Sequence, residues 1–135
     1  MNNIQDLQIG VAGEHLVCAD LIKKGYNAYL SDQGLSYDVI ADIDGKLYKI
    51  QVKTTSKYRA VPQRKKYTPA YLFWIKRCGK GGKKSYTEKD FDFMALVALD
   101  KNIIGYLKPN LAKGTMHLNE QKLKDLTFEK LWDQK

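Results

Sequence analysis

The segment that decides the fold is residues 36–54, SYDVIADIDGKLYKIQVKT. Apolar and polar residues alternate on both sides of Asp44-Gly45, a dipeptide typical of a two-residue type I′ turn. This pattern predicts a β-hairpin with strands over residues 37–42 and 46–54. Because successive side chains of a strand point to opposite faces, the turn also decides which residues share a face.

The hairpin register brings polar side chains together. A two-residue loop pairs Ile43 with Lys46, which places Asp38 opposite Gln51 and Ser36 opposite Lys53, the next pair on the same face. Directly opposed side chains have Cβ atoms about 4.5–5.5 Å apart, so a carboxylate and a carboxamide there can share one cation. A longer loop would shift the register and remove this geometry. The other face is apolar and is predicted to be core: Tyr37, Val39, Ala41, Tyr48, Ile50 and Val52.

A helix is predicted upstream of the hairpin, over residues 4–24. Asn3 can cap its first turn, and Gly25 stands where a left-handed C-terminal residue belongs. Residues spaced by threes and fours predict its buried face: Ile4, Leu7, Val11, Glu14, Cys18, Leu21 and Ile22.

Glu14 stands on this apolar stripe, where a carboxylate is costly unless it is paired or binds a metal. At the edge of the stripe it could instead reach solvent or pair with a lysine, but a metal shared with Asp38 would supply the missing partner. Gly10 and Gly13 each cost about 0.5–1 kcal/mol relative to alanine inside a helix. Close contact with the sheet, or with a DNA backbone, would explain both.

The remaining chain predicts one α+β domain over residues 1–135, with helices against a central, largely antiparallel sheet. The further predicted elements are strands over residues 27–31, 71–75, 91–99 and 103–106, basic loops over 55–69 and 76–85, and a helix within 120–132.

Charge indicates a polyanionic partner. The formal net charge is +8, and residues 49–84 contain twelve Lys or Arg and no Asp or Glu. The rest of the chain has eleven basic and fifteen acidic residues. A basic segment with interspersed aromatic residues favours nucleic acid over a solvated face or an anionic membrane. The candidate phosphate contacts are Lys57, Arg59, Arg64, Lys65, Lys66, Lys80, Lys83 and Lys84.

Other features exclude several classes. No apolar run approaches the roughly 20 residues of a membrane span, and the first residues lack the pattern of a secretory signal. Cys18 and Cys78 form neither a ligand set nor a disulfide framework, so we expect reduced thiols in a cytoplasmic protein. His15 and His117 belong to no ligand motif and are expected to be structural or on the surface.

The core of the chain resembles the PD-(D/E)XK endonuclease superfamily. The resemblance rests on GEHLVCADLIKKGYNAYLSDQGLSYDVIADIDGKLYKIQVKTTS (13–56) and on FDFMALVALDKNIIGYLKP (91–109). Archaeal Holliday junction resolvases share the order of helix glutamate, hairpin aspartate and acid-x-lysine. The match is closer to the branch in which glutamine replaces that acid, which includes a cyanobacterial group I intron homing endonuclease.

The resemblance implies a three-layer α/β/α-like restriction-endonuclease fold and a catalytic set of Glu14, Asp38, Gln51 and Lys53. It implies a Mg²⁺ ion, replaceable by Mn²⁺, held by Asp38, the Gln51 side-chain oxygen and the Val52 carbonyl. Glu14 would hold a water on the metal or a second ion. Lys53 would orient the nucleophile and balance charge on the phosphate.

The resemblance thus implies a Mg²⁺-dependent DNA endonuclease, either like a homing endonuclease or like a Holliday junction resolvase. Gln51 removes one negative charge from the usual site, which leaves open a catalytically inactive DNA-binding module. A nucleic-acid protein of another kind, such as an RNA binder, is a third alternative. Two cuts on duplex or branched DNA require two sites, so a homodimer or homotetramer is expected.

Overall fold

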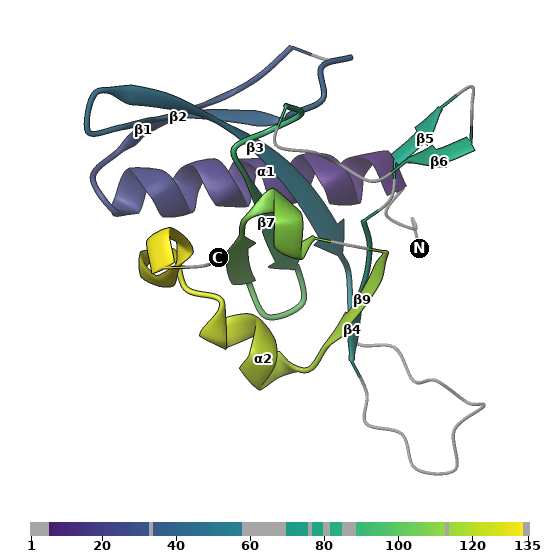
Figure 1. The fold of residues 1–135 in the computed structure, drawn as a ribbon. Coiled ribbons are helices and arrows are strands. Elements are labelled where there is room, and N and C mark those ends of the chain that lie inside the picture. Colours follow the sequence, from purple (N-terminus) through teal and green to yellow (C-terminus); the bar gives the residue numbers. More distant parts are fainter. Residues whose placement is uncertain are drawn as a thin grey trace, which may run out of the picture.

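The computed structural model describes residues 6–32, 34–57, 70–75, 77–79, 82–84, 89–112 and 114–133. Figure 1 shows a central sheet with the long first helix along one side and short helices near the C-terminus. In chain order the elements are α1 (Asp6–Lys23), β1 (Asn27–Leu30), β2 (Val39–Ile43), β3 (Lys46–Thr55), β4 (Tyr71–Trp74), β5 (Arg77–Gly79), β6 (Gly82–Lys84), β7 (Phe93–Ala98), β8 (Ile103–Leu107), η1 (Pro109–Leu111), β9 (Thr115–Leu118), α2 (Glu120–Asp125) and η2 (Glu129–Asp133).

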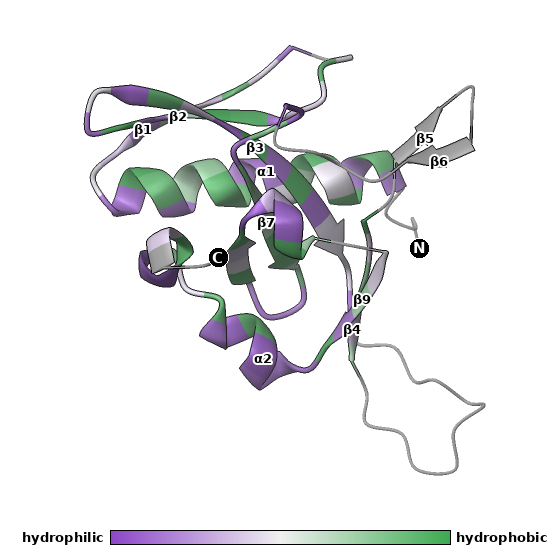
Figure 2. Cartoon of the chain, viewed as in Figure 1, coloured by the Kyte–Doolittle hydropathy of each residue, from purple (hydrophilic) through white to green (hydrophobic). Residues whose placement is uncertain are grey.

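Five strands form the central sheet in the order β1-β2-β3-β7-β8. The pairs β1–β2, β2–β3 and β7–β8 are antiparallel, whereas β3 and β7 are parallel. Strand β7 is continuously apolar, as the hydropathy colouring in Figure 2 shows, and it is buried on both faces. The expected α+β class with a mixed, largely antiparallel sheet is confirmed.

The predicted hairpin is confirmed in its turn and register, but its first strand begins at Val39 and not at residue 37. Ile43 pairs with Lys46, and the ladder continues to Val39 opposite Ile50. Both turn residues have positive φ, 53° at Asp44 and 87° at Gly45, as a type I′ turn requires.

Two apolar clusters lie on opposite faces of the sheet. The first joins α1 to the even-numbered residues of β3 and also contains Phe128 and Leu131 near the C-terminus. The second lies beneath β4 and α2 and includes Met94 and Leu96 of β7. Tyr37 was expected on the first face but packs against the second cluster, because the chain leaves the regular ladder before residue 39.

Helix α1 ends as predicted but buries a different face. Gly25 has the expected positive φ of 96°, while Asn3 lies outside the described residues. The predicted stripe is wrong in part, since Leu7, Val11 and Ile22 are exposed. The buried residues are Gly13, Val17 and Leu21. The stripe was misjudged because Gly13, which carries no hydrophobic signal, is buried in tight contact with the side chain of Thr54.

The C-terminal helix is shorter than expected because the chain crosses the edge of the sheet. α2 places Leu123 in the second cluster, whereas η2 places Leu131 in the first. Between them, the Leu126 carbonyl accepts a hydrogen bond from the backbone N–H of Tyr106 on edge strand β8, at 2.8 Å. A continuous helix over residues 120–132 could not supply all three contacts.

Two further predictions need correction. Residues 77–79 and 82–84 form the two-stranded β5–β6 hairpin instead of a basic loop, and Thr55 belongs to β3. Strand β9 was not predicted; it pairs with β4 to form a ribbon. Residues 58–69 lie outside the described part of the chain. Within that part, no helix is long and apolar enough to cross a bilayer.

Candidate active site

Asp38 lies where strands β2 and β3 separate. The paired ladder ends at Val39 and Ile50, so the direct Asp38–Gln51 pair expected from the register does not form. Instead, the Asp38 N–H donates to the Ile50 carbonyl at 2.8 Å. Its carboxylate Oδ2 accepts the Val52 N–H at 2.8 Å. The hydrogen bond from the Val52 N–H to the Asp38 side chain thus replaces a backbone–backbone hydrogen bond of the ladder. It fixes the Asp38 carboxylate over β3.

The segment that carries Asp38 is anchored by two serines. Ser31 donates its N–H to the Asp38 carbonyl at 2.9 Å and its hydroxyl to the Tyr37 carbonyl at 2.6 Å. Ser36 donates its hydroxyl to the carbonyl of Asp90 at 2.9 Å. Fixed backbone on both sides of a functional residue preorganises its side chain. No sequence pattern predicted these serines, because their partners are carbonyls that only the fold brings near.

Glu14, Asp38 and Lys53 are electrostatically coupled. Burial raises the pKa of Glu14, and the neighbouring Asp38 carboxylate raises it further. Burial also raises the pKa of Asp38, although the Val52 N–H and the Lys53 ammonium oppose the shift. Two partly buried carboxylates that repel each other can be stabilised by a cation bound beside them.

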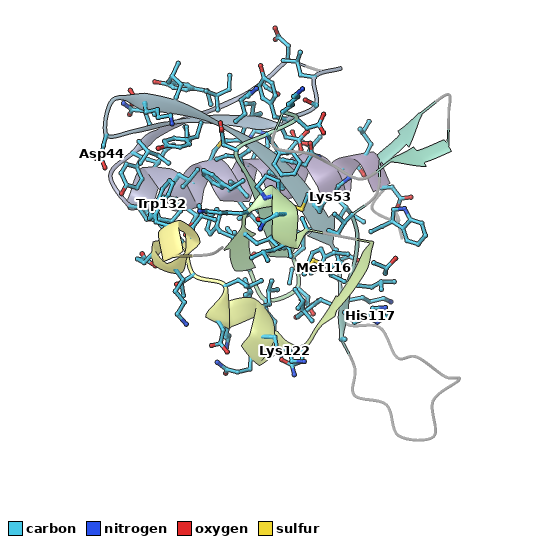
Figure 3. The ribbon with its side chains drawn as sticks, in the orientation of Figure 1. Asp44, Lys53, Met116, His117, Lys122 and Trp132 are labelled. Atoms are coloured by element: carbon cyan, nitrogen blue, oxygen red, sulfur yellow. The ribbon has the colours of Figure 1, made fainter. Side chains whose placement is uncertain are left out.

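Gln51 and Lys53 share one face of β3, opposite to the face that α1 covers. Their parallel partners on β7 are Met94 and Leu96, which belong to the second cluster. Gln51 is 8% exposed, and Figure 3 shows Lys53 on the C-terminal part of β3. Asp38 therefore lies at the strand gap between Glu14, which comes from the α1 side, and the β3 face that carries Gln51 and Lys53.

Oxygen donors make up the candidate metal site. In an extended strand the N–H and C=O of one residue face the same neighbour, so the Val52 carbonyl points to the gap that Asp38 occupies. With the Gln51 amide and the two carboxylates, it would supply oxygen donors of the kind that suit Mg²⁺ or Mn²⁺. Among the described residues no three His, Cys, Asp or Glu form a metal-binding group.

Lys57 is the candidate phosphate contact whose side chain the structure describes. Lys57 is exposed two residues beyond the end of β3. The side chains of Arg59, Arg64, Lys65, Lys66, Lys80, Lys83 and Lys84 lie outside the described part of the structure. His15 and His117 are exposed, and Cys18 is a partly buried free thiol against the first cluster.

The fold is restriction-endonuclease-like. A family model described as PD-(D/E)XK endonuclease matches residues 4–125, and the chain belongs to this family. A similar solved structure is the bacterial homing endonuclease I-Ssp6803I, with a TM-score of 0.69 and 21% identity over 86% of this chain and 79% of that chain. This likeness shows a shared fold. The comparison with curated proteins finds no match.

Proposed function

We propose that the protein is a divalent-metal-dependent DNA endonuclease, with Mg²⁺ as its natural ion and Glu14, Asp38, Gln51 and Lys53 as its site. The observation that carries the proposal is the coupling of Glu14, Asp38 and Lys53 at the β2–β3 gap. Membership of the endonuclease family supports it, and so does the formal net charge of +8.

Each group has a distinct role in this proposal. Asp38, the Gln51 oxygen and the Val52 carbonyl would hold the ion, and Glu14 would orient water beside it. When bound, the ion acts as a Lewis acid that offsets charge on the phosphate. Lys53, held near Asp38, would place its ammonium against the same phosphate and orient the attacking water. The basic segment would bind the DNA backbone in a salt-dependent manner.

A plasmid-nicking assay with Mg²⁺, Mn²⁺ or EDTA tests this function. We expect Asp38→Asn and Lys53→Ala to abolish nicking while both variants still fold. In Asp38→Asn, the side-chain oxygen of Asn still accepts the Val52 N–H. Matched controls lie at the far end of the same hairpin: Asp44→Asn and Lys46→Ala should cut like wild type. Equal activity of Asp38→Asn and wild type would refute the assignment.

The substrate is tested with linear duplex, four-way junction and single-stranded DNA. Homing-type activity would appear as cutting at one duplex sequence, and resolvase-type activity as symmetric cuts on the junction. Two cuts per substrate support a homodimer or homotetramer, which analytical ultracentrifugation would detect. We also infer a cytoplasmic protein, with which the free thiol of Cys18 is compatible.

The second candidate is an inactive DNA-binding module, favoured by the missing third carboxylate at Gln51. In that case the wild-type protein would bind the DNA substrates but would cut none of the three.

A further inference from the structure

A cavity of about 390 Å³ opens beside Lys53, between three elements. Asp6 and Gly10 of α1 line one side, the last residues of β3 line a second, and Leu72 and Trp74 of β4 line the third. Its size lies within the range of small-ligand sites. The cavity adjoins the candidate active site through Lys53 but does not include Asp38.

Gly10 has no packing reason to be glycine among the described residues. A Cβ at Gly13 would lie 2.9 Å from both Cβ and Cγ2 of Thr54, so contact with β3 requires that glycine. A Cβ at Gly10 would meet nothing within 4 Å. Glycine is unfavourable inside a helix, yet here it lines the cavity wall. The open space that a Cβ would enter at Gly10 agrees with its position on the cavity wall.

The lining favours a nucleobase over a phosphate. Asp6 would repel a phosphate but can accept hydrogen bonds from the N–H groups of a base. The indole of Trp74 is 50% exposed and offers a flat surface for stacking. Lys53, at the same cavity, is suited to the phosphate that follows the base.

We propose that this cavity receives one unstacked nucleobase of the bound DNA, next to the phosphate held at Lys53. Trp74 stacks on the base, and Asp6 accepts from its N–H groups. Extruding a base costs unstacking energy, which is least for a base that is already unpaired. The proposal deepens the proposed function and rests on it for the identity of the ligand as DNA.

The test is a binding measurement without cleavage, by fluorescence anisotropy of labelled duplexes in EDTA. One duplex is fully paired, the second carries a single-nucleotide bulge, and the third carries the same bulge without its base. We expect the wild-type protein to bind the bulged duplex roughly 10- to 100-fold more tightly than the paired one, as base–aromatic stacking predicts. The abasic bulge should lose this preference.

Four variants localise the effect. Trp74→Ala should abolish the preference, and Trp74→Phe should retain most of it. Gly10→Leu should fill the cavity and abolish it, whereas Ala12→Leu, at an exposed position of the same helix, should not. Equal binding of abasic and normal bulges, or an unchanged preference in Trp74→Ala and Gly10→Leu, would overturn the proposal. Because no cutting is required, an inactive nuclease that still shows the preference would contradict only the proposed function.

Discussion

Replacing Gly13 by alanine should destabilise the protein, although alanine is the better helix former. The added Cβ would approach Thr54 to 2.9 Å at two carbon atoms and closer still at Oγ1. Nonbonded carbon atoms are best separated by about 3.5–4.0 Å. Because Gly13 is buried against the sheet, α1 and β3 must move apart to relieve the contact.

The expected magnitude follows from two opposing terms. Alanine contributes about 1 kcal/mol of helix propensity, and overpacking of a core contact costs about 1–3 kcal/mol. The net loss is up to about 2 kcal/mol, which lowers the melting temperature by up to roughly 10 °C at this chain length. Glu14 is the next residue, so the same shift moves its carboxylate relative to Asp38. Nuclease activity should therefore fall even under conditions in which the variant is fully folded.

Urea denaturation of two alanine variants on the same helix checks this reasoning. Gly10→Ala meets no atom within 4 Å and should raise the free energy of unfolding by about 0.5–1 kcal/mol. In the background of Gly13→Ala, Thr54→Ala should recover stability, because Thr54 Oγ1 is buried without a hydrogen-bond partner among the described residues. If Gly13→Ala stabilises the protein as much as Gly10→Ala does, the inferred helix–sheet contact is wrong.

Three further predictions concern charge. Gln51→Glu should tighten Mg²⁺ binding about tenfold, because ligand charge tunes affinity, and should lower metal-free stability; calorimetry and thermal unfolding measure the two effects. Tyr106→Phe removes the 2.6 Å hydrogen bond from its hydroxyl to Asp20 Oδ2 and should cost about 1–2 kcal/mol in urea denaturation; no loss would contradict that bond. The raised pKa values of Glu14 and Asp38 mean that the metal-free fold binds protons more readily than the unfolded chain. Its stability should therefore fall as pH rises from the ordinary carboxyl range through the raised pKa values, and metal binding should weaken as pH falls through them. Melting curves of Asp38→Asn should show a smaller pH dependence, and parallel curves for variant and wild type would refute the shift.

Local chemistry predicted the hairpin and most of the sheet. The Asp44-Gly45 turn and strict alternation determine a register that needs no tertiary information. The order of the strands was not predictable in this way, because β3 and β7 pair in parallel across more than 35 intervening residues. Strand β9 was missed for the same reason, since its partner β4 is distant in sequence.

The candidate site was predicted in its residue types but not in its detailed geometry. The register brought Asp38 near residues 51–53, yet the ladder ends at Val39 and Ile50, two pairs earlier than the predicted strands imply. The carboxylate consequently binds the Val52 N–H. The cavity beside Lys53 was not predicted, because its lining comes from three separate elements, α1, β3 and β4, that share no sequence motif.

The neutral side chain at position 51 has a physical rationale in this arrangement. Gln51 is almost fully buried and lies next to Val52, to which Asp38 is bonded. Burial already raises the pKa of Asp38, and repulsion from Asp38 adds to the raised pKa of Glu14. A third carboxylate would add both a desolvation cost and a repulsion to the metal-free state. An amide keeps the oxygen donor and avoids both costs, but it contributes less attraction to a divalent ion. In the proposed site, Gln51 would therefore lower metal affinity and raise the stability of the empty protein, and activity should require a higher concentration of free divalent ion than in Gln51→Glu.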